Sequence, residues 1–114
     1  MSGTVPEITC EELKKMMMDN KVLIIDVRSP GELEKGTIVG SINIPVNSVE
    51  EKLTLDPDKF QEQFGIEKPK ETSSLVFHCQ KGLRGACAVK IAQTLGYTSV
   101  QNLAGGFQQW TGKE

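Results

Sequence analysis

Several features that would place a protein in a specialised class are scarce or missing in this sequence of 114 residues. The longest wholly apolar run, residues 22–25, is far shorter than the roughly 20 residues that cross a bilayer. Asp and Glu (15) slightly outnumber Lys and Arg (13), so no basic excess indicates a nucleic-acid partner. Residues 1–7 carry neither a basic residue nor the apolar stretch of a targeting peptide. We therefore expect a cytoplasmic protein with no membrane or nucleic-acid partner.

Disulfide-forming and metal-binding residues are scarce too. The three cysteines, Cys10, Cys79 and Cys87, are an odd number without a Cys-x-x-Cys pair, which is not the pattern of a disulfide scaffold. The single histidine, His78, directly precedes Cys79, so the few soft or imidazole ligands are badly spaced for a tetrahedral zinc site. The sequence therefore predicts free thiols in a reducing compartment, and neither a metal nor another cofactor.

What the sequence does contain is an alternation of short apolar strands with helical patterns. The length fits one domain spanning residues 1–114. Alternation of this kind is typical of α/β folds with a largely parallel sheet. The expected strands lie at Ile8 and over residues 22–27, 41–44, 75–78 and 100–103. The expected helices lie over residues 9–20, 30–35, 47–64 (with a break near Asp56-Pro57) and 86–95, followed by a last turn after Gly105-Gly106.

The most informative segment is a buried strand that ends at a cysteine and leads through a glycine-containing loop into a helix. Cys79 follows the strand 75–78, where the carboxyl end of a parallel strand opens toward a ligand. A tight loop from Cys79 to Gly85 turns backbone N–H groups toward the sulfur, and the N-terminus of the next helix adds partial positive charge. Lys81 and Arg84 add full charges. All these effects favour the thiolate, so we predict that Cys79 is a nucleophile that needs no separate base.

Two features of this segment leave alternatives open. A lone cysteine at the end of a strand is often no more than a small buried apolar residue. The spacing Cys79-x4-Arg84 is also one residue shorter than the Cys-x5-Arg loop of cysteine phosphatases, and Gly85 stands where their arginine would be. A shorter loop leaves less room between the sulfur and the amides. This favours one additional sulfur atom on Cys79 over a bound phosphate ester.

Further motifs, taken in chain order, resemble the rhodanese (thiosulfate sulfurtransferase) family over almost the whole sequence. They are Asp26-Val27-Arg28 with Glu32, the segment from Gly36 to Pro45, the loop from Cys79 to Arg84, and the ending Leu95-Gly96-Tyr97, Val100, Leu103, Gly105-Gly106 and Trp110. The segment from Gly36 is similar to the family's Gly-His-Ile-x-Gly-Ala-x-Asn-Ile-Pro, with Thr37 in place of the histidine. The loop and the long segment before its strand look most like the single-domain thiosulfate:glutathione sulfurtransferases.

The resemblance implies a rhodanese-like α/β fold, with a central, mostly parallel five-stranded sheet and helices on both faces. It implies that Cys79 takes the outer sulfur of thiosulfate as a persulfide and passes it to glutathione, thioredoxin or cyanide. The residues of the substrate- and persulfide-binding loop would be Gln80, Lys81, Gly82, Leu83 and Arg84. Nothing in the sequence indicates an obligate oligomer, so we expect a monomer.

Two supporting residues at the end of the strand 22–27 have more than one interpretation. Asp26 faces the same rim as Cys79, where it either pairs with Arg84 or is satisfied by backbone N–H groups. Arg28 either lines the rim and contacts the substrate or forms a structural salt bridge with Glu32, and we favour the salt bridge.

Two residues near the nucleophile have a simple interpretation and a functional one. Side chains alternate along a strand, so His78 should point away from the face of Cys79 and pack in the core rather than act as a base. Cys87 could resolve an oxidised or persulfidated Cys79 as a disulfide, but we favour a core or partly exposed filler role.

Three functions fit these observations. A sulfurtransferase is favoured, and a cysteine phosphatase or arsenate reductase is disfavoured by the four-residue spacing between Cys79 and Arg84. A non-catalytic interaction or stress-response module is the third. The intact Cys79, Gly82 and Arg84 argue against it, because a docking platform needs no anion-binding loop around a thiol.

Overall fold

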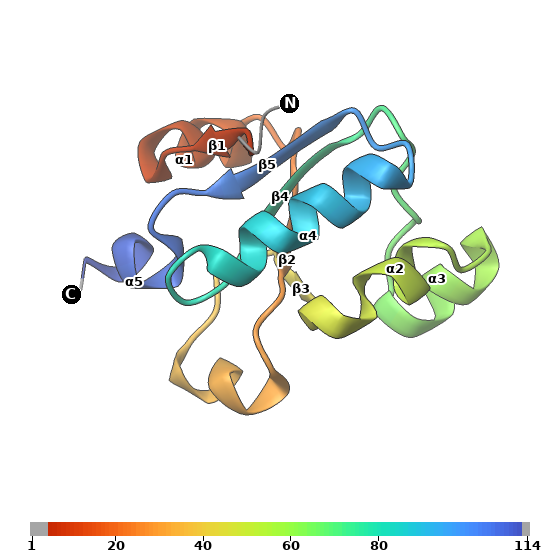
Figure 1. Ribbon diagram of the computed structural model, residues 1–114, viewed down its shortest axis with the longest axis horizontal. Coiled ribbons are helices and arrows are strands. Elements are labelled where there is room, and N and C mark those ends of the chain that lie inside the picture. Colours follow the sequence, from red (N-terminus) through yellow and green to blue (C-terminus); the bar gives the residue numbers. More distant parts are fainter. Residues whose placement is uncertain (1–4, 113–114) are drawn as a thin grey trace.

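A sheet of five parallel strands forms the centre of the computed structural model, which describes residues 5–112 (Figure 1). The strands are β1 (Glu7–Ile8), β2 (Leu23–Asp26), β3 (Ile42–Asn43), β4 (Ser74–His78) and β5 (Ser99–Leu103). Their spatial order is β1-β5-β4-β2-β3, and every pairing is parallel. The predicted α/β fold with a mostly parallel five-stranded sheet is confirmed, and the carboxyl ends of its strands share one edge.

Helices cover both faces of this sheet, because alternate residues of a buried strand turn apolar side chains to opposite sides. Leu75 and Phe77 of β4 pack with α2 (Val49–Leu53), α3 (Pro57–Phe64) and α4 (Leu83–Thr94). Val76, between them, packs with α1 (Cys10–Met18) and α5 (Gly106–Thr111) on the other face. Two short 3-10 helices, η1 (Pro30–Lys35) and η2 (Val46–Ser48), follow β2 and β3.

Local signals set the starts of two of these helices. Thr9 and Glu12 form a capping box at α1, in which each side chain accepts the other's backbone N–H at 3.1 and 3.0 Å. The Asp56 carboxylate caps α3 by accepting two backbone N–H groups at 3.0 and 3.2 Å, directly before Pro57. The predicted helix after Thr9 and the predicted break near Asp56-Pro57 are therefore confirmed.

Helix α4 begins at Leu83 rather than at Ala86, three residues earlier than predicted. Gly82 has a φ of +117°, which favours glycine, and its carbonyl accepts the Ala86 N–H at 3.1 Å. Leu83 and Arg84 therefore belong to the first helical turn. The apolar periodicity does not reveal this start, because Leu83 is 85% exposed.

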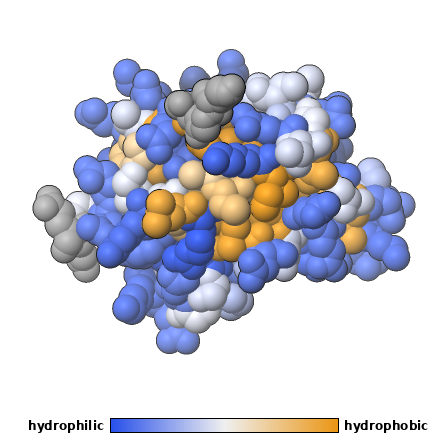
Figure 2. Space-filling view, viewed as in Figure 1, coloured by the Kyte–Doolittle hydropathy of each residue, from blue (hydrophilic) through white to orange (hydrophobic). Residues whose placement is uncertain are grey.

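The face seen in Figure 2 is hydrophilic around a central band of apolar side chains that follows α4. Across residues 5–112, every helix is too short or too polar to traverse a bilayer. The large apolar side chains that are strongly exposed in this range are Met18, Val39 and Leu83. Of these, Leu83 lines a cavity together with Cys79.

Candidate active site

Cys79 lies in a tight turn between β4 and α4, at the carboxyl edge of the sheet. Its Sγ accepts the Gly82 N–H at 3.0 Å, and the residue is only 2% exposed. A cavity of about 290 Å³ opens onto it, lined by Glu32, Cys79, Gln80, Lys81, Leu83 and Arg84. The 12-residue helix α4 begins here, so its N-terminal partial charge acts at the same place. The structure thus gathers the predicted loop around one cavity.

The backbone of this turn is held from behind by the start of α5. Phe107 N–H donates to the Cys79 carbonyl at 2.8 Å, and Gln108 N–H donates to the Gln80 carbonyl at 3.0 Å. Gly106 makes this approach possible, because a Cβ there would lie 2.6 Å from the Cys79 carbonyl oxygen. Its φ of +64° also favours glycine. Gly106, which the sequence indicated as part of a motif and of a turn, therefore shapes the site.

Asn102 of β5 supports the same turn and was missed by sequence analysis. Its buried amide donates from Nδ2 to the Gly82 carbonyl at 3.0 Å. Its Oδ1 lies so close to Gly85 that a Cβ at that position would collide with it. Gly85 stands where cysteine phosphatases have their arginine. Because of this contact with Asn102, a side chain at that position has no room in this fold. The alternation of β5 alone could have indicated that Asn102 is buried.

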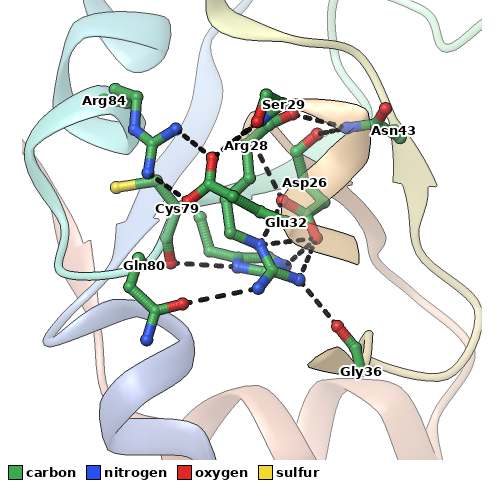
Figure 3. Close-up of polar contacts among 10 residues, drawn as sticks. Asp26, Arg28, Ser29, Glu32, Gly36, Asn43, Cys79, Gln80 and Arg84 are labelled. Carbon is green, nitrogen blue, oxygen red and sulfur yellow. Dashed lines mark hydrogen bonds and ion pairs between the residues drawn. The ribbon is translucent and has the colours of Figure 1, made fainter. Parts of the chain in front are cut away.

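Behind the turn, Asp26 and Arg28 form a buried ion pair that we call the floor of the site (Figure 3). Arg28 Nη2 lies 2.7 Å from Asp26 Oδ2, and neither residue is more than 1% exposed. The same guanidinium donates to the Gly36 carbonyl at 2.8 Å and to Gln80 Oε1 at 3.4 Å. It also lies over the Phe107 ring, 4.3 Å from the centroid. Arg28 thus ties β2 to the end of η1, to the Cys79 turn and to α5.

Glu32 and Arg84 form a second ion pair at the mouth of the cavity, which we call the rim. Arg84 Nη1 and Nη2 donate to Glu32 Oε1 and Oε2 at 2.6 and 3.0 Å, while the side chains stay 38% and 35% exposed. Hydrogen bonds from Arg84, and then from Ser29, lower the pKa of Glu32 to about 2. Glu32 in turn raises the pKa of Arg84, with a smaller contribution from the Cys79 sulfur.

These two pairs correct the expected ion pairs of Asp26 and Arg28. Asp26 does not pair with Arg84, and its other predicted partner, a backbone N–H group, is found at Arg28. Arg28 does not pair with Glu32, and its burial keeps it away from the mouth of the cavity. The reason is local geometry at the end of β2. The Arg28 backbone N–H donates to Asp26 Oδ1 at 3.0 Å, and its side chain folds back onto the same carboxylate. Glu32, in the first turn of η1, is left to meet Arg84.

His78 packs in the core, as predicted. Its ring is fully buried, and its Nδ1 lies 3.3 Å from the Cys79 carbonyl oxygen. Its Nε2 lies 3.6 Å from Asp26 Oδ2. Burial is the main cause that lowers the pKa of His78, so the ring is neutral at neutral pH. His78 therefore contacts the Cys79 backbone rather than its sulfur.

The remaining predicted side chains lie around the cavity or outside it. Gln80 turns its side-chain oxygen toward Arg28, whereas Lys81 is exposed at the mouth. Cys87 is exposed on α4 and does not line the cavity, so a position in the core is excluded. Larger hollows of about 510 and 550 Å³ lie around residues 66–71, and neither has a cysteine or histidine in its lining.

Comparisons with known proteins identify the family of this chain. Residues 9–113 match the family model described as a rhodanese-like domain. Thiosulfate:glutathione sulfurtransferase of Homo sapiens is 42% identical over 115 residues, covering 100% of this chain and 99% of the relative. The Saccharomyces cerevisiae protein of the same name is 36% identical over 110 residues, covering 95% and 79%. A solved human single-domain sulfurtransferase superposes with a TM-score of 0.90 at 40% identity, covering 97% and 99%.

The fold and the site define an α/β protein built around a cysteine loop at the carboxyl edge of its sheet. The chain belongs to the rhodanese family. The resemblance that the sequence motifs indicated is therefore confirmed, and so is the rhodanese-like fold with its five-stranded sheet.

Proposed function

We propose that Cys79 carries sulfane sulfur as a persulfide, which it takes from thiosulfate and passes to a thiol acceptor. The observation that carries this proposal is the small cavity at the Cys79 sulfur, with its hydrogen-bond donors. The Gly82 N–H donates to Sγ at 3.0 Å, Arg84 lines the same cavity, and the cavity measures only about 290 Å³. A thiolate and a persulfide are both sulfur anions, and such donors stabilise both. The names of the relatives support a sulfurtransferase reaction.

The first half-reaction loads the enzyme. The Cys79 thiolate attacks the outer sulfur of thiosulfate, and a new S–S bond forms. The S–S bond of thiosulfate breaks, and its electron pair leaves with sulfite. A monoanion and a dianion yield a monoanion and a dianion, so this step needs no oxidant and no base. The Gly82 N–H, which already faces Sγ, stabilises the charge before and after the transfer.

The second half-reaction unloads it. The thiolate of the acceptor attacks the outer sulfur of the persulfide, and the electron pair of the broken bond returns to Cys79. We propose glutathione as the acceptor, since two relatives carry it in their names, and thioredoxin as a second acceptor. Two half-reactions through a covalent intermediate predict ping-pong kinetics. A nucleophilic thiol must stay reduced, so we further propose that the protein works in the cytoplasm. We also propose that it works as a monomer, since nothing in the sequence indicates an obligate oligomer.

Mass spectrometry tests the loading step directly. After exposure to thiosulfate and removal of excess reagent, the wild-type protein should gain one sulfur atom on the peptide that contains Cys79. Cys79→Ser should gain none, and Cys87→Ser, which removes an exposed thiol outside the cavity, should gain it as the wild type does. Adding glutathione should then remove the sulfur.

A wild-type protein that gains no sulfur contradicts the proposal. Turnover of an aryl phosphate that depends on Cys79 would favour a phosphatase instead. We do not expect it, because Asn102 leaves no room at Gly85 for the arginine of a phosphatase loop.

A further inference from the structure

The carboxylate of Glu32 has no evident use in the sulfur transfer proposed above. A cavity that receives a dianion gains nothing from an anion at its mouth, because like charges repel. Yet Glu32 lines this cavity together with Lys81 and Arg84. Its hydrogen bonds hold the pKa of Glu32 at about 2, so the carboxylate stays ionised at neutral pH.

Helix η1 holds this carboxylate in place independently of Arg84. Oε1 of Glu32 accepts the Ser29 N–H and the Ser29 hydroxyl, each at 3.0 Å. The Glu32 N–H donates to the Ser29 carbonyl, also at 3.0 Å. The far end of η1 is fastened by the buried Arg28, which donates to the Gly36 carbonyl at 2.8 Å. The negative charge at the mouth is therefore preorganised rather than carried on a loose side chain.

Glu32 occupies Arg84 with both of its oxygens. One N–H on each terminal nitrogen of the guanidinium donates to the carboxylate, at 2.6 and 3.0 Å. Figure 3 shows the guanidinium between this carboxylate and the Cys79 sulfur. Three of the five guanidinium N–H groups remain for other partners, but the charge is neutralised. Among the described residues that line the cavity, Lys81 is then the one cation without an ionic partner.

This arrangement treats two kinds of anion differently. A single sulfur atom on Cys79 sits next to the Gly82 N–H and Arg84, and it does not need to reach Glu32. Thiosulfate and sulfite carry charge on three oxygens around a central sulfur, so they extend toward the mouth and compete with Glu32 for Arg84.

We propose that Glu32 is a positioning and specificity-determining residue that, by occupying Arg84, keeps oxyanions weakly bound beside Cys79. The proposal rests on the sulfur transfer proposed above. Weak binding costs some affinity for thiosulfate, but it lets sulfite leave and prevents it from taking the sulfur back. The persulfide then persists until a thiol acceptor arrives.

Glu32→Gln tests this role, because glutamine keeps the size of the side chain and can still accept the Ser29 hydrogen bonds. The KM for thiosulfate should fall about tenfold, since removing one unit charge beside an anion at a half-exposed site changes affinity by about one power of ten. Product inhibition by sulfite should strengthen by a similar factor, and kcat should fall as sulfite release slows. Glu34→Gln, an exposed carboxylate on the same η1 helix, is the matched control and should leave these constants unchanged.

Two further variants separate charge from structure. Glu32→Asp keeps the charge, so its KM and sulfite inhibition should stay closer to the wild-type values than to those of Glu32→Gln. If Glu32 has only a structural role, Glu32→Asp should change KM and sulfite inhibition at least as much as Glu32→Gln does, because its side chain is shorter. In the double variant E32Q/R84Q sulfite should again bind weakly, because no free guanidinium is left. Equal sulfite inhibition in E32Q and in the double variant would overturn a role through Arg84.

Binding of sulfite can also be measured without turnover, as protection of Cys79 from iodoacetamide, followed on the Cys79 peptide by mass spectrometry. E32Q should be protected at about tenfold lower sulfite than the wild type. Glu32→Ala, a second neutral variant, should behave as E32Q does, and it serves if E32Q does not fold. Unchanged protection in the folded neutral variants overturns the role of Glu32 even if thiosulfate still loads Cys79. If thiosulfate fails to load the wild type, the sulfur-transfer proposal fails, and the protection assay still decides the role of Glu32.

Discussion

The floor and the rim of the site contain the same kinds of group and differ chiefly in burial. In the floor, Asp26 and Arg28 are at most 1% exposed, whereas in the rim the Arg84 and Glu32 side chains are 38% and 35% exposed. Removing one partner of a buried pair leaves a charge in the core that water cannot reach, whereas a half-exposed partner is simply rehydrated. Two ion pairs of the same composition therefore have different roles. The floor stabilises the fold, and the rim sets how tightly anions bind in the cavity.

The largest expected effect is on the floor. Arg28→Ala should lower the free energy of unfolding by about 3–5 kcal/mol, because it leaves the buried Asp26 carboxylate uncompensated. Arg84→Ala, the matched change on the rim, should cost no more than about 1 kcal/mol. Urea unfolding of the three proteins measures both. If Arg84→Ala costs as much as Arg28→Ala, burial does not distinguish the two pairs. The double variant D26L/R28M should recover part of the loss, since it removes both charges.

The next effect concerns the backbone that rests on the floor. Gly106→Ala should cost about 2–4 kcal/mol, because its Cβ would meet the Cys79 carbonyl oxygen and alanine resists a positive φ. Gly112 also has a positive φ, +76°, but nothing within 4 Å, so Gly112→Ala should cost only about 1–2 kcal/mol. Thermal or urea unfolding measures the difference, and sulfur loading of Cys79 should fall in Gly106→Ala alone. Equal costs would show that strain, rather than the close approach to Cys79, requires the glycine.

A smaller effect appears when the rim is titrated. Hydrogen bonds from Arg84 lower the pKa of Glu32 from its ordinary 4.5 to about 2 in the folded state. The stability that this contributes is complete above pH 4.5 and is lost as the pH falls toward 2. Solvent screening at a half-exposed pair limits it to about 1 kcal/mol. Urea unfolding of the wild type and E32Q between pH 7 and 2 should show the wild type's advantage shrinking over that interval. A constant difference would mean that the carboxylate's charge does not stabilise the fold.

Sequence patterns predicted the sheet well, because the apolar strands and their turns leave few arrangements open. They also placed Cys79, Gly82 and Arg84 at one site, since a loop this short keeps neighbours together. They did not predict which acid meets which arginine. Asp26 and Glu32 both lie near the end of β2, and the choice depends on the direction in which Arg28 folds back.

Two other features of the site depend on conformation rather than on composition. The early start of α4 follows from the positive φ of Gly82, which apolar periodicity does not register. The contribution of Asn102 requires knowing that β5 and the Cys79 turn are neighbours, a contact between residues 20 positions apart. The sequence therefore predicted which residues form the rim and the floor, but not the hydrogen bonds that pair them.

The smallest expected effect is at Lys81, which is exposed, lines the cavity and belongs to neither ion pair. Lys81→Ala should leave stability within about 0.5 kcal/mol of the wild type, since an exposed side chain without partners contributes little. It should raise the KM for thiosulfate about three- to fivefold at low salt, because one attractive charge at the mouth is lost. The effect should fade as salt shortens the screening length, which is about 10 Å at 0.1 M. Lys90→Ala, which removes an exposed lysine further along α4, is the matched control and should change neither quantity. If the two variants have the same KM at every salt concentration, Lys81 plays no part in anion capture.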